Sequence, residues 1–334
     1  MAELANTAAR TVTVIDESEV RDFNRVNYVR VSERSDGQRL DNFLMRVLKG
    51  VPKSHIYRIV RNGEVRINKK RAECQTKITL DDEIRIPPVR TAVMDEVKPL
   101  AADELPILRE DRDLIIVNKP SGLACHGGSG VAFGLIERLR ASRPECKFLE
   151  LAHRLDRDTS GVLIVCKTRK ALVRLHEMQR QGEIEKRYRL LVQGDWVNQR
   201  EHVRAPLTKY TLASGERRVR VDEENGLRSH TIFTLIKRYG DVSYLEAELK
   251  TGRTHQIRVH AASVGHPLVG DAKYGDYAFN EAVRKGALGL PFGRLFLHAE
   301  RLKFTHPVTK EPMVVIAPLE ASLKALIDNL NDRQ

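Results

Sequence analysis

The stretch from residue 151 to residue 161, Leu-Ala-His-Arg-Leu-Asp-Arg-Asp-Thr-Ser-Gly, combines two arginines, two aspartates, a histidine and two hydroxyl side chains. These are groups that move protons, stabilise charge and act as nucleophiles. The apolar run from Val162 to Cys166 follows directly and predicts a fully buried strand. A polar loop next to such a strand is held rigidly, and loops of this kind often carry function. Composition alone favours the alternative, a charged surface turn, because most charge runs are solvated.

The order of residue types in this stretch is more specific than its composition. The run His153-Arg154-Leu155-Asp156, followed after two residues by Thr159-Ser160-Gly161, resembles the catalytic motif of the pseudouridine synthases of the large ribosomal-subunit (RluA) family. The resemblance implies that Asp156, and not Asp158, is the catalytic carboxylate. It also implies that Arg154 enters the gap that an everted uridine leaves. We expect His153 to be a hydrogen-bonded structural group.

Two later segments resemble further motifs of the same family. In Lys186-Arg187-Tyr188, which lies on an alternating strand-like segment, the resemblance implies that Tyr188 stacks on uracil and helps to remove the C5 proton. The run from Thr251 to His260 resembles the third motif, and the downstream Gly270-Asp271 and Tyr274-Gly275 match the family too. Arg258 is the implied partner of Asp156, with Arg253 the less favoured choice. Lys186 and Arg253 are expected to contact the RNA. Without the motif resemblance, the alternatives are that Tyr188 is a packed core residue and that Arg258 forms an ordinary surface ion pair.

Pseudouridine formation breaks the bond between ribose C1′ and uracil N1 and joins C1′ to C5 instead. It needs no redox change, group donor or metal, so we expect no cofactor and no metal site. A carboxylate beside C1′ can stabilise positive charge or bond covalently there, as in glycosidases. The same carboxylate could instead remove a sugar proton to give a glycal, and the sequence leaves both routes open. A buried aspartate needs a fixed cation to stay ionised, and an arginine fork can bind both of its oxygens.

The bulk composition favours a polyanionic partner. The chain has 334 residues and a formal net charge of +12, with 41% hydrophobic residues. No apolar run approaches the ~20 residues of a membrane helix, and the first ten residues do not resemble a secretory signal. The four cysteines form no Cys-x-x-Cys pair. These features predict a cytoplasmic protein with no membrane partner.

A basic segment near the N-terminus contains nine lysines and arginines, against one acidic residue, between residues 46 and 71. Helical spacing over residues 40–48, a second helix opening at residues 52–54, and short strands at 65–67 and 83–86 surround these charges. The order helix, helix, strand resembles the S4 RNA-binding module, although a basic solvated face is the alternative. The resemblance implies RNA contacts by Lys53, Arg58, Arg61, Lys69, Lys70 and Arg71.

The expected architecture is α+β with two domains. Residues 1–36 form a loosely ordered leader with a short strand at 28–31, residues 37–98 an S4-like domain, and residues 99–334 a catalytic domain. The larger domain is expected to be a mixed, mainly antiparallel sheet with flanking helices, as in the synthase family. Strands are predicted at 114–117, 162–166, 184–192, 229–237, 243–250, 295–304 and 313–316, and helices near 133–139, at 169–179, from 254 and at 319–330.

The resemblance implies that the protein isomerises uridines in 23S ribosomal RNA, free or in an assembling large subunit, and that it acts as a monomer. Three other functions remain open from the sequence. One is a non-catalytic RNA-binding protein of ribosome assembly, and another is a pseudouridine synthase for a different RNA such as tRNA. The third is a cofactor-free hydrolase that uses Asp156 and His153.

Overall fold

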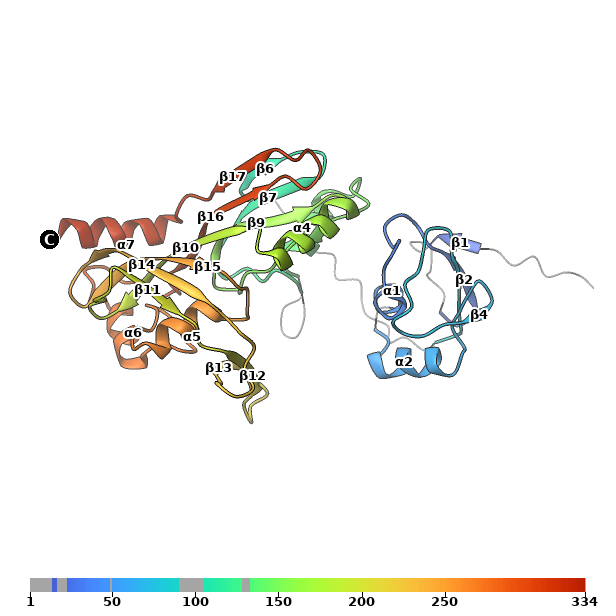
Figure 1. Cartoon of the computed structure of the whole chain (residues 1–334), viewed down its shortest axis with the longest axis horizontal. Coiled ribbons are helices and arrows are strands. Elements are labelled where there is room, and N and C mark those ends of the chain that lie inside the picture. The colour runs from blue at the N-terminus through green and yellow to red at the C-terminus, as the bar shows by residue number, and fades with distance from the viewer. Residues whose placement is uncertain (1–13, 17–22, 49, 90–104, 128–132, 334) are drawn as a thin grey trace, which may run out of the picture. The chain divides into compact units, whose positions relative to one another are not determined.

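The computed structural model describes residues 14–16, 23–48, 50–89, 105–127 and 133–333. The chain divides into two compact units, residues 1–98 and 99–334, which we describe separately (Figure 1). Within the described ranges, no helix combines the length and the apolar character that crossing a membrane requires.

The small unit packs two helices against a five-stranded sheet. Helix α1 (Leu40–Val47) and helix α2 (Lys53–Arg61) bury their apolar stripes in one cluster with residues of the sheet. The residue that caps the N-terminus of α2 is Pro52, within the predicted start at 52–54. The helix ends before Gly63, whose φ of 73° suits a residue without a side chain. The sheet order is β1-β2-β5-β3-β4, with strands Val14–Asp16, Asn27–Arg30, Glu83–Ile86, Arg66–Ile67 and Lys70–Arg71.

The predicted leader of residues 1–36 is too long. Val29 and Val31 are fully buried in the core of the small unit, and β2 pairs with β5 from Asn27 to Arg30. The sequence suggested a strand here but gave no sign of its partner. Residues from Phe23 onward pack against this core, so they belong to the small unit.

The large unit is built on a ten-stranded sheet. The main path runs β11-β14-β15-β10-β16-β9-β7-β6, with β17 paired to β16 and β8 to β9. The β9–β16 pair is parallel, and the other described pairs of this sheet are antiparallel, as predicted. In chain order from β6 to β11 the strands are Ile107–Glu110, Leu114–Lys119, Glu150–Leu151, Ser160–Cys166, Glu185–Gln193 and Arg200–Val203, and β14 to β17 are Thr231–Arg238, Val242–Leu249, Leu297–Thr305 and Pro312–Ile316.

Strand β9 contributes side chains to two hydrophobic clusters, one on each face of the sheet. Leu163 and Val165 belong to one cluster, while Val162 and Ile164 belong to the other, because successive side chains point to opposite faces of a sheet. Both faces of β9 are thus covered, which explains its continuous apolar run. Helix α3 (Leu135–Ser142) packs in the first cluster and helix α4 (Arg169–Gln181) in the second.

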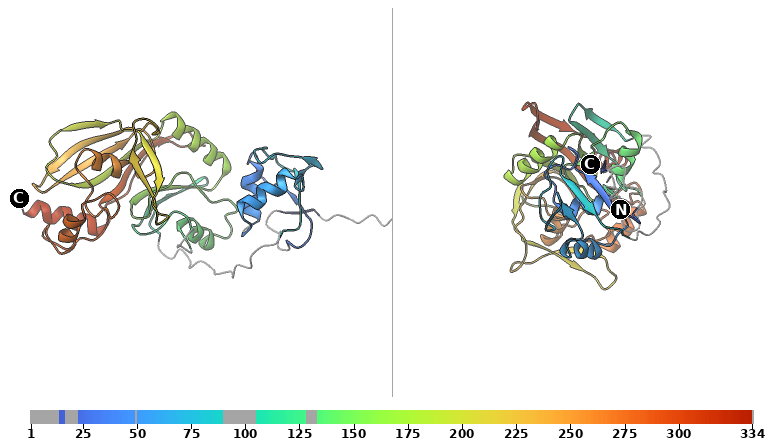
Figure 2. Two further views of the ribbon diagram at one scale, coloured as in Figure 1. Left: turned by 90° about the horizontal axis from the view of Figure 1, so that it is seen from below. Right: turned by 90° about the vertical axis from the view of Figure 1, so that its right-hand side faces the viewer.

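Three helices and one hairpin complete the large unit. Helices α6 (Tyr277–Arg284) and α7 (Ala321–Asp332) share a cluster at one end of the sheet (Figure 2). Helix α5 (Gln256–Ser263) contacts strand β13 (Arg217–Val221), which pairs with β12 (Leu207–Thr211) in a separate two-stranded sheet. The sequence predicted α5 and α7 but missed α6, β11 and this hairpin, which have short or mixed polar patterns.

Gly161 allows two strands to approach closely next to the motif loop. Its φ is 114°, and an added Cβ would lie 2.2 Å from the carbonyl oxygen of Ala299 on β16. Any side chain here would push β9 away from β16, so the motif needs glycine at this position. The loop that ends in Gly161 is therefore fixed to the sheet.

Candidate active site

Segments far apart in the sequence line one cavity of about 780 Å³ in the large unit. The end of β8 and the loop to β9 contribute residues 151–156 and Thr159, and strand β10 contributes Lys186 and Tyr188. The segment before and within α5 contributes residues 252–258. The three sequence motifs therefore meet around a single cavity.

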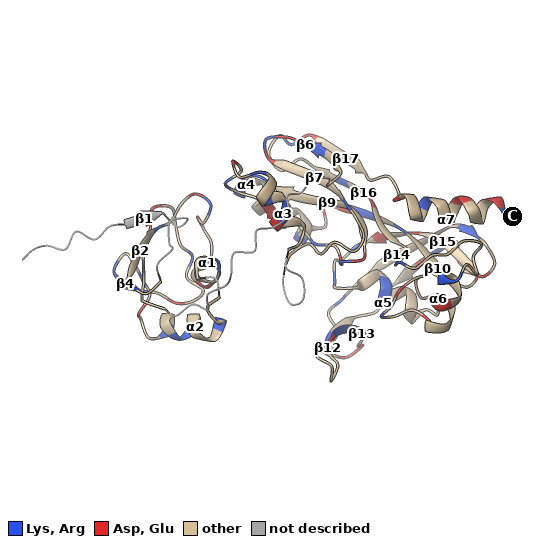
Figure 3. Cartoon of the chain, turned by 180° about the vertical axis from the view of Figure 1, so that it is seen from behind, with Lys and Arg blue, Asp and Glu red and all other residues tan. Residues whose placement is uncertain are grey.

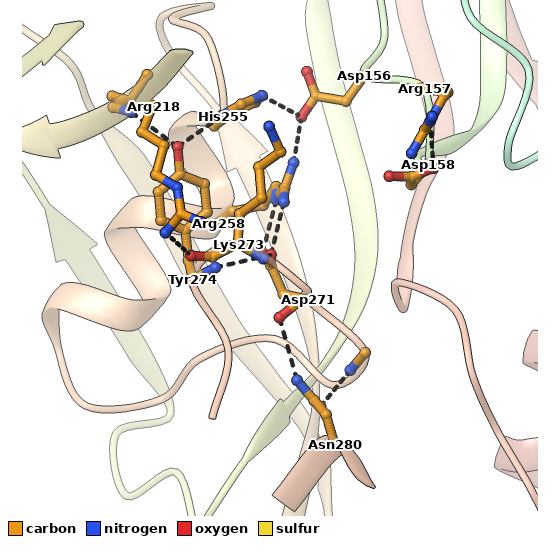
Figure 4. A network of polar contacts seen from close by, with 12 residues as sticks. Asp156, Arg157, Asp158, Arg218, His255, Arg258, Asp271, Lys273, Tyr274 and Asn280 are labelled. Carbon is orange, nitrogen blue, oxygen red and sulfur yellow. Dashed lines mark hydrogen bonds and ion pairs between the residues drawn. The ribbon is translucent and has the colours of Figure 1, made fainter. Parts of the chain in front are cut away.

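Asp156 and Arg258 contact each other in this cavity. The Nη1 atom of Arg258 donates to Oδ2 of Asp156 at 3.2 Å, across 102 residues of sequence. Arg258 also donates through Nε and Nη2 to the two oxygens of Asp271, at 2.7 Å each (Figure 4). Because the two hydrogen bonds to Asp271 fix the plane of the guanidinium, the remaining nitrogen, Nη1, is directed at Asp156. Arg253 makes no such contact; its Nε donates to the carbonyl of Arg228.

The Arg258–Asp271 pair is buried, whereas Asp156 is partly open. Burial lowers the pKa of Arg258, but Asp271 and Asp156 outweigh it and raise the pKa above the ordinary value. Burial raises the pKa of Asp271, yet hydrogen bonds from Arg258 and the backbone hold it below the ordinary value. The side chain of Asp156 is 27% exposed, against 5% for Arg258 and 0% for Asp271. The expectation of a carboxylate shut away from water is thus corrected: it faces the cavity.

Buried groups hold the loop that carries Asp156. The ammonium group of Lys119 donates to three backbone carbonyls, including that of Arg157 at 2.9 Å. Lys119 is fully buried, and burial lowers its pKa to about 8. The Ser121 hydroxyl donates to the Asp158 carbonyl at 2.8 Å, and the Cys125 thiol contacts the backbone N–H and C=O of Leu155. No role was assigned to Lys119 from the sequence; the signal that could have found it is the run Asn118-Lys119-Pro120, directly after the buried strand predicted at 114–117.

Tyr188 and Lys186 lie on strand β10 and face the cavity. Tyr188 is 8% exposed, and burial, together with the charge of Asp156, raises its pKa. Its register partners on the two neighbouring strands are Ala247 and Ala299, whose side chains are small. Burial lowers the pKa of Lys186, and among the described residues no acidic group forms an ion pair with it.

Arg154 and His153 line the same cavity with different surroundings. Arg154 is exposed. His153 Nε2 accepts a hydrogen bond from the backbone N–H of Ile164 at 3.2 Å, and burial lowers the pKa of this histidine to about 3. A neutral, backbone-bonded imidazole matches the expected structural group rather than an acid-base catalyst.

The small unit presents the basic residues singled out in the sequence. Helix α2 buries Ile56, Ile59 and Val60 and exposes its basic residues on another side (Figure 3). The β3–β4 turn has positive φ at Asn68 and Lys69, which brings two exposed lysines to its tip. All six RNA contacts predicted for the small unit are exposed, and in the described chain none has an acidic partner: Lys53, Arg58, Arg61, Lys69, Lys70 and Arg71.

One group of side chains in the described ranges has metal-like spacing, and it does not suit a metal. Asp111, Asp113 and His306 bring potential ligand atoms within 4.8 Å of one another. However, Nδ1 of His306 accepts from the backbone N–H groups of Val308 and Thr309. With Nδ1 as the acceptor, a neutral ring carries its hydrogen on Nε2, which lies 3.4 Å from Asp111 and offers no lone pair to a metal.

Comparison with known proteins identifies the family. A model of RNA pseudouridylate synthases matches residues 113–263, and a model of the S4 domain matches residues 38–84. The "Ribosomal large subunit pseudouridine synthase C" of Escherichia coli (strain K12) is 50% identical over 313 residues, 92% of this chain and 97% of that protein. The protein of the same name from Pasteurella multocida is 47% identical over 315 residues, 92% of this chain and 95% of that protein. The chain belongs to the pseudouridine synthase family.

Solved structures show the same synthase fold. Human RNA Pseudouridylate Synthase Domain Containing 4 is 23% identical, with a TM-score of 0.56 over 68% of this chain and 93% of that chain. Human RNA Pseudouridylate Synthase Domain Containing 1 is 26% identical, with a TM-score of 0.53 over 70% of this chain and 98% of that chain. The predicted fold class, an S4 domain with an α+β synthase domain on a mixed sheet, is confirmed.

Three side chains of this synthase site were given no role from the sequence. His255 lies directly before α5, and Asp271 and Tyr274 lie in the loop after it; all three are close to Asp156 or Arg258. The signal was present, since Gly270-Asp271 and Tyr274-Gly275 resembled family motifs. What the sequence could not supply was the contact of Asp271 with Arg258.

Proposed function

We propose that this pseudouridine synthase isomerises specific uridines of 23S ribosomal RNA, with Asp156 as the catalytic carboxylate. The observation that carries the proposal is the hydrogen bond between Asp156 and the buried Arg258 at the wall of a cavity that Tyr188 also lines. The 50% identity with proteins named for the large ribosomal subunit supports the choice of RNA. The formal net charge of +12 supports a polyanionic substrate.

In the proposed reaction an everted uridine enters the cavity, at a cost of a few kcal/mol for unstacking. Asp156 meets C1′ as the N1–C1′ bond breaks, either stabilising the sugar cation, bonding to it, or removing a sugar proton. The uracil rotates, C5 bonds to C1′, the C5 proton leaves, and N1 takes up a proton. Arg258 orients the carboxylate through its hydrogen bond, and Tyr188 stacks on the base and assists removal of the C5 proton. A carboxylate partly open to the cavity suits direct contact with the sugar.

Other cationic groups would hold the RNA. Arg154, exposed beside Asp156, would enter the gap that the uridine leaves, while Lys186 and Arg253 would meet phosphates near the cavity. The small unit would supply a second, sequence-independent contact through its six exposed basic residues. The substrate would be ribosomal RNA, free or in an assembling particle, and the enzyme would work in the cytoplasm. All proposed catalytic groups come from one chain, so a monomer suffices; light scattering of the free protein tests this.

The test compares the wild-type protein with Asp156→Asn on 23S transcripts that carry tritium at uridine C5. We expect the variant to bind RNA nearly as tightly as the wild type but to release no tritium above background, because the amide cannot replace the carboxylate. Turnover by Asp156→Asn would contradict the role of this residue. Binding without tritium release by the wild type would indicate an assembly protein, and free uracil would indicate a hydrolase. Tritium release from tRNA but not from 23S RNA would show that the substrate is tRNA.

A further inference from the structure

A chain of polar contacts leads from the β12–β13 hairpin to Asp156. The backbone N–H of Val219 donates to the Tyr274 hydroxyl at 2.9 Å, and this hydroxyl lies 2.7 Å from Nδ1 of His255. The other ring nitrogen of His255, Nε2, lies 3.8 Å from Oδ2 of Asp156 (Figure 4). The hairpin, the loop after α5 and the turn before α5 therefore meet at the proposed catalytic carboxylate.

The donors in this chain can be assigned. The amide hydrogen of Val219 points at the Tyr274 oxygen, which must therefore accept. Burial raises the pKa of Tyr274, so the phenol keeps its own hydrogen, and the remaining partner for that hydrogen is Nδ1 of His255. An imidazole that accepts at Nδ1 carries its hydrogen on Nε2 when it is neutral. That hydrogen faces Asp156.

Charges around His255 act in both directions. Burial, the largest effect, lowers the pKa of His255, and the positive charges of Arg258 and Lys273 lower it further. The negative charges of Asp156 and Asp271 raise it. The net direction is downward, which favours the neutral ring near pH 7. The ring also packs edge-on against Tyr274, with centroids 5.5 Å apart. Loss of the Tyr274 hydroxyl alone would therefore leave the ring packing in place.

The backbone holds His255 in an uncommon conformation. Its φ is 52° and its ψ is 20°, in the left-handed region, directly before the first residue of α5. Such a conformation is uncommon in residues other than glycine and costs free energy, and conformations of this kind cluster at functional sites. The Gln256 side chain secures the turn by accepting from the Arg253 N–H at 3.0 Å and from the Thr251 hydroxyl at 2.7 Å. The turn fixes where the imidazole points.

We propose that His255, oriented by Tyr274, is a positioning residue for Asp156 and that Oδ1 of Asp156 is the oxygen that reacts with the nucleoside. This inference rests on the proposed function. Oδ2 is bound by Arg258 and faced by the Nε2–H of His255, whereas Oδ1 has no hydrogen-bond partner among the described residues. Arg258 donates to Oδ2, and the His255 ring lies on the side of the same oxygen, so Oδ1 is left to face the sugar. The 3.8 Å gap between His255 Nε2 and Oδ2 is too long for a hydrogen bond, and catalytic contacts of this kind often shorten to hydrogen-bond distance when substrate binds.

Nitrogen-15 NMR of the imidazole rings tests the orientation without any activity measurement. In the wild-type protein we expect the hydrogen of His255 on Nε2, with Nδ1 unprotonated, at neutral pH. In Tyr274→Phe we expect a mixture of the two tautomers and a raised histidine pKa, because the donor to Nδ1 is lost. Tyr277→Phe, whose side chain is 81% exposed on α6, is the matched control and should give the wild-type spectrum. A wild-type ring with its hydrogen on Nδ1, or one protonated at neutral pH, would overturn the inference.

Two substitutions of His255 test the effect on the reaction. Asparagine tolerates the left-handed backbone but is too short to reach Asp156, so we expect His255→Asn to lower kcat by about tenfold to hundredfold with KM nearly unchanged. Glutamine places an amide N–H near the position of Nε2, so His255→Gln should recover part of kcat. Wild-type kcat in both variants, with Asp156→Asn inactive, would overturn this inference and leave the proposed function standing. If the wild type itself does not isomerise uridine, the proposed function fails, while the tautomer result still stands.

Discussion

Two sets of positive side chains in this protein differ in how their charge is held. Arg258 of the large unit is buried and bound to two carboxylates, one of which, Asp271, is itself fully buried. The basic residues of the small unit, such as Lys69 and Lys70, are exposed, and among the described residues they have no acidic partner. One set has a fixed geometry, and the other is free to meet phosphates.

The difference separates two tasks. A buried, paired guanidinium keeps its orientation and can support charge where a bond is broken, which exposed lysines cannot do in water. Exposed lysines release counterions when they meet RNA, which gives affinity that depends on salt and little on sequence. We therefore expect substitutions in the first set to change stability and kcat, and those in the second to change RNA affinity.

The largest effect is expected from Asp271→Ala. It leaves Arg258 buried without its main partner, which typically costs about 3–5 kcal/mol. Urea denaturation of the full chain measures the change in the free energy of unfolding. The matched control is Asp328→Ala, which breaks the exposed Lys324–Asp328 pair and should cost no more than about 1 kcal/mol. Equal costs for the two variants would show that burial does not distinguish these pairs.

Arg258→Lys is expected to have the next largest effect. Lysine keeps the charge but cannot form the fork to Asp271 and reach Asp156 at the same time. We expect kcat for tritium release to fall roughly a hundredfold, with RNA affinity little changed. Arg253→Lys is the control, because Arg253 does not contact Asp156. A large loss of RNA affinity in Arg258→Lys would show that Arg258 serves mainly to bind RNA, as proposed for the basic residues of the small unit.

The pH dependence of stability offers a finer test of the buried pair. The pKa of Asp271 is lower in the folded protein than its ordinary value, so its contribution to stability is present above the ordinary aspartate pKa of about 3.9. That contribution is lost as the pH falls through the folded-state pKa. In urea titrations, Asp271→Asn should therefore lose less stability than the wild type on acidification below about pH 4. If the free energies of unfolding of the wild type and of Asp271→Asn fell in parallel below about pH 4, Asp271 would not be the source of this acid sensitivity.

The smallest effect on the chemistry is expected at the tip of the β3–β4 turn. Lys69→Ala combined with Lys70→Ala should lower RNA affinity and reduce the slope of log K against log salt by roughly 0.7–0.9 for each lost phosphate contact. The value of kcat at saturating RNA should not change. Lys324→Ala, which removes an exposed and acid-paired lysine of the large unit, is the control. An unchanged salt slope would mean that the two lysines do not touch phosphate.

Much of the fold could be predicted from local patterns. Strand β5 was predicted with its observed bounds, and β7, β9, β10 and helix α4 within two residues at each end, because their apolar periodicity is strong. The elements that were missed, such as α6 and the β12–β13 hairpin, are short and partly exposed, so their residues show little periodicity. The burial of Val29 was missed because its partner strand lies more than fifty residues later.

The sequence by itself determined the order of the motifs, the family they resemble, the clustered positive charge and the strands whose faces must be buried. These depend on residue type and short spacing, which the chain carries directly. Only the tertiary structure decided that Asp271 holds Arg258, that Lys119 supports the motif loop, and that Tyr274 turns His255 toward Asp156. Val219 and Tyr274, for example, are 55 residues apart, and no local pattern encodes which distant polar groups share a hydrogen bond.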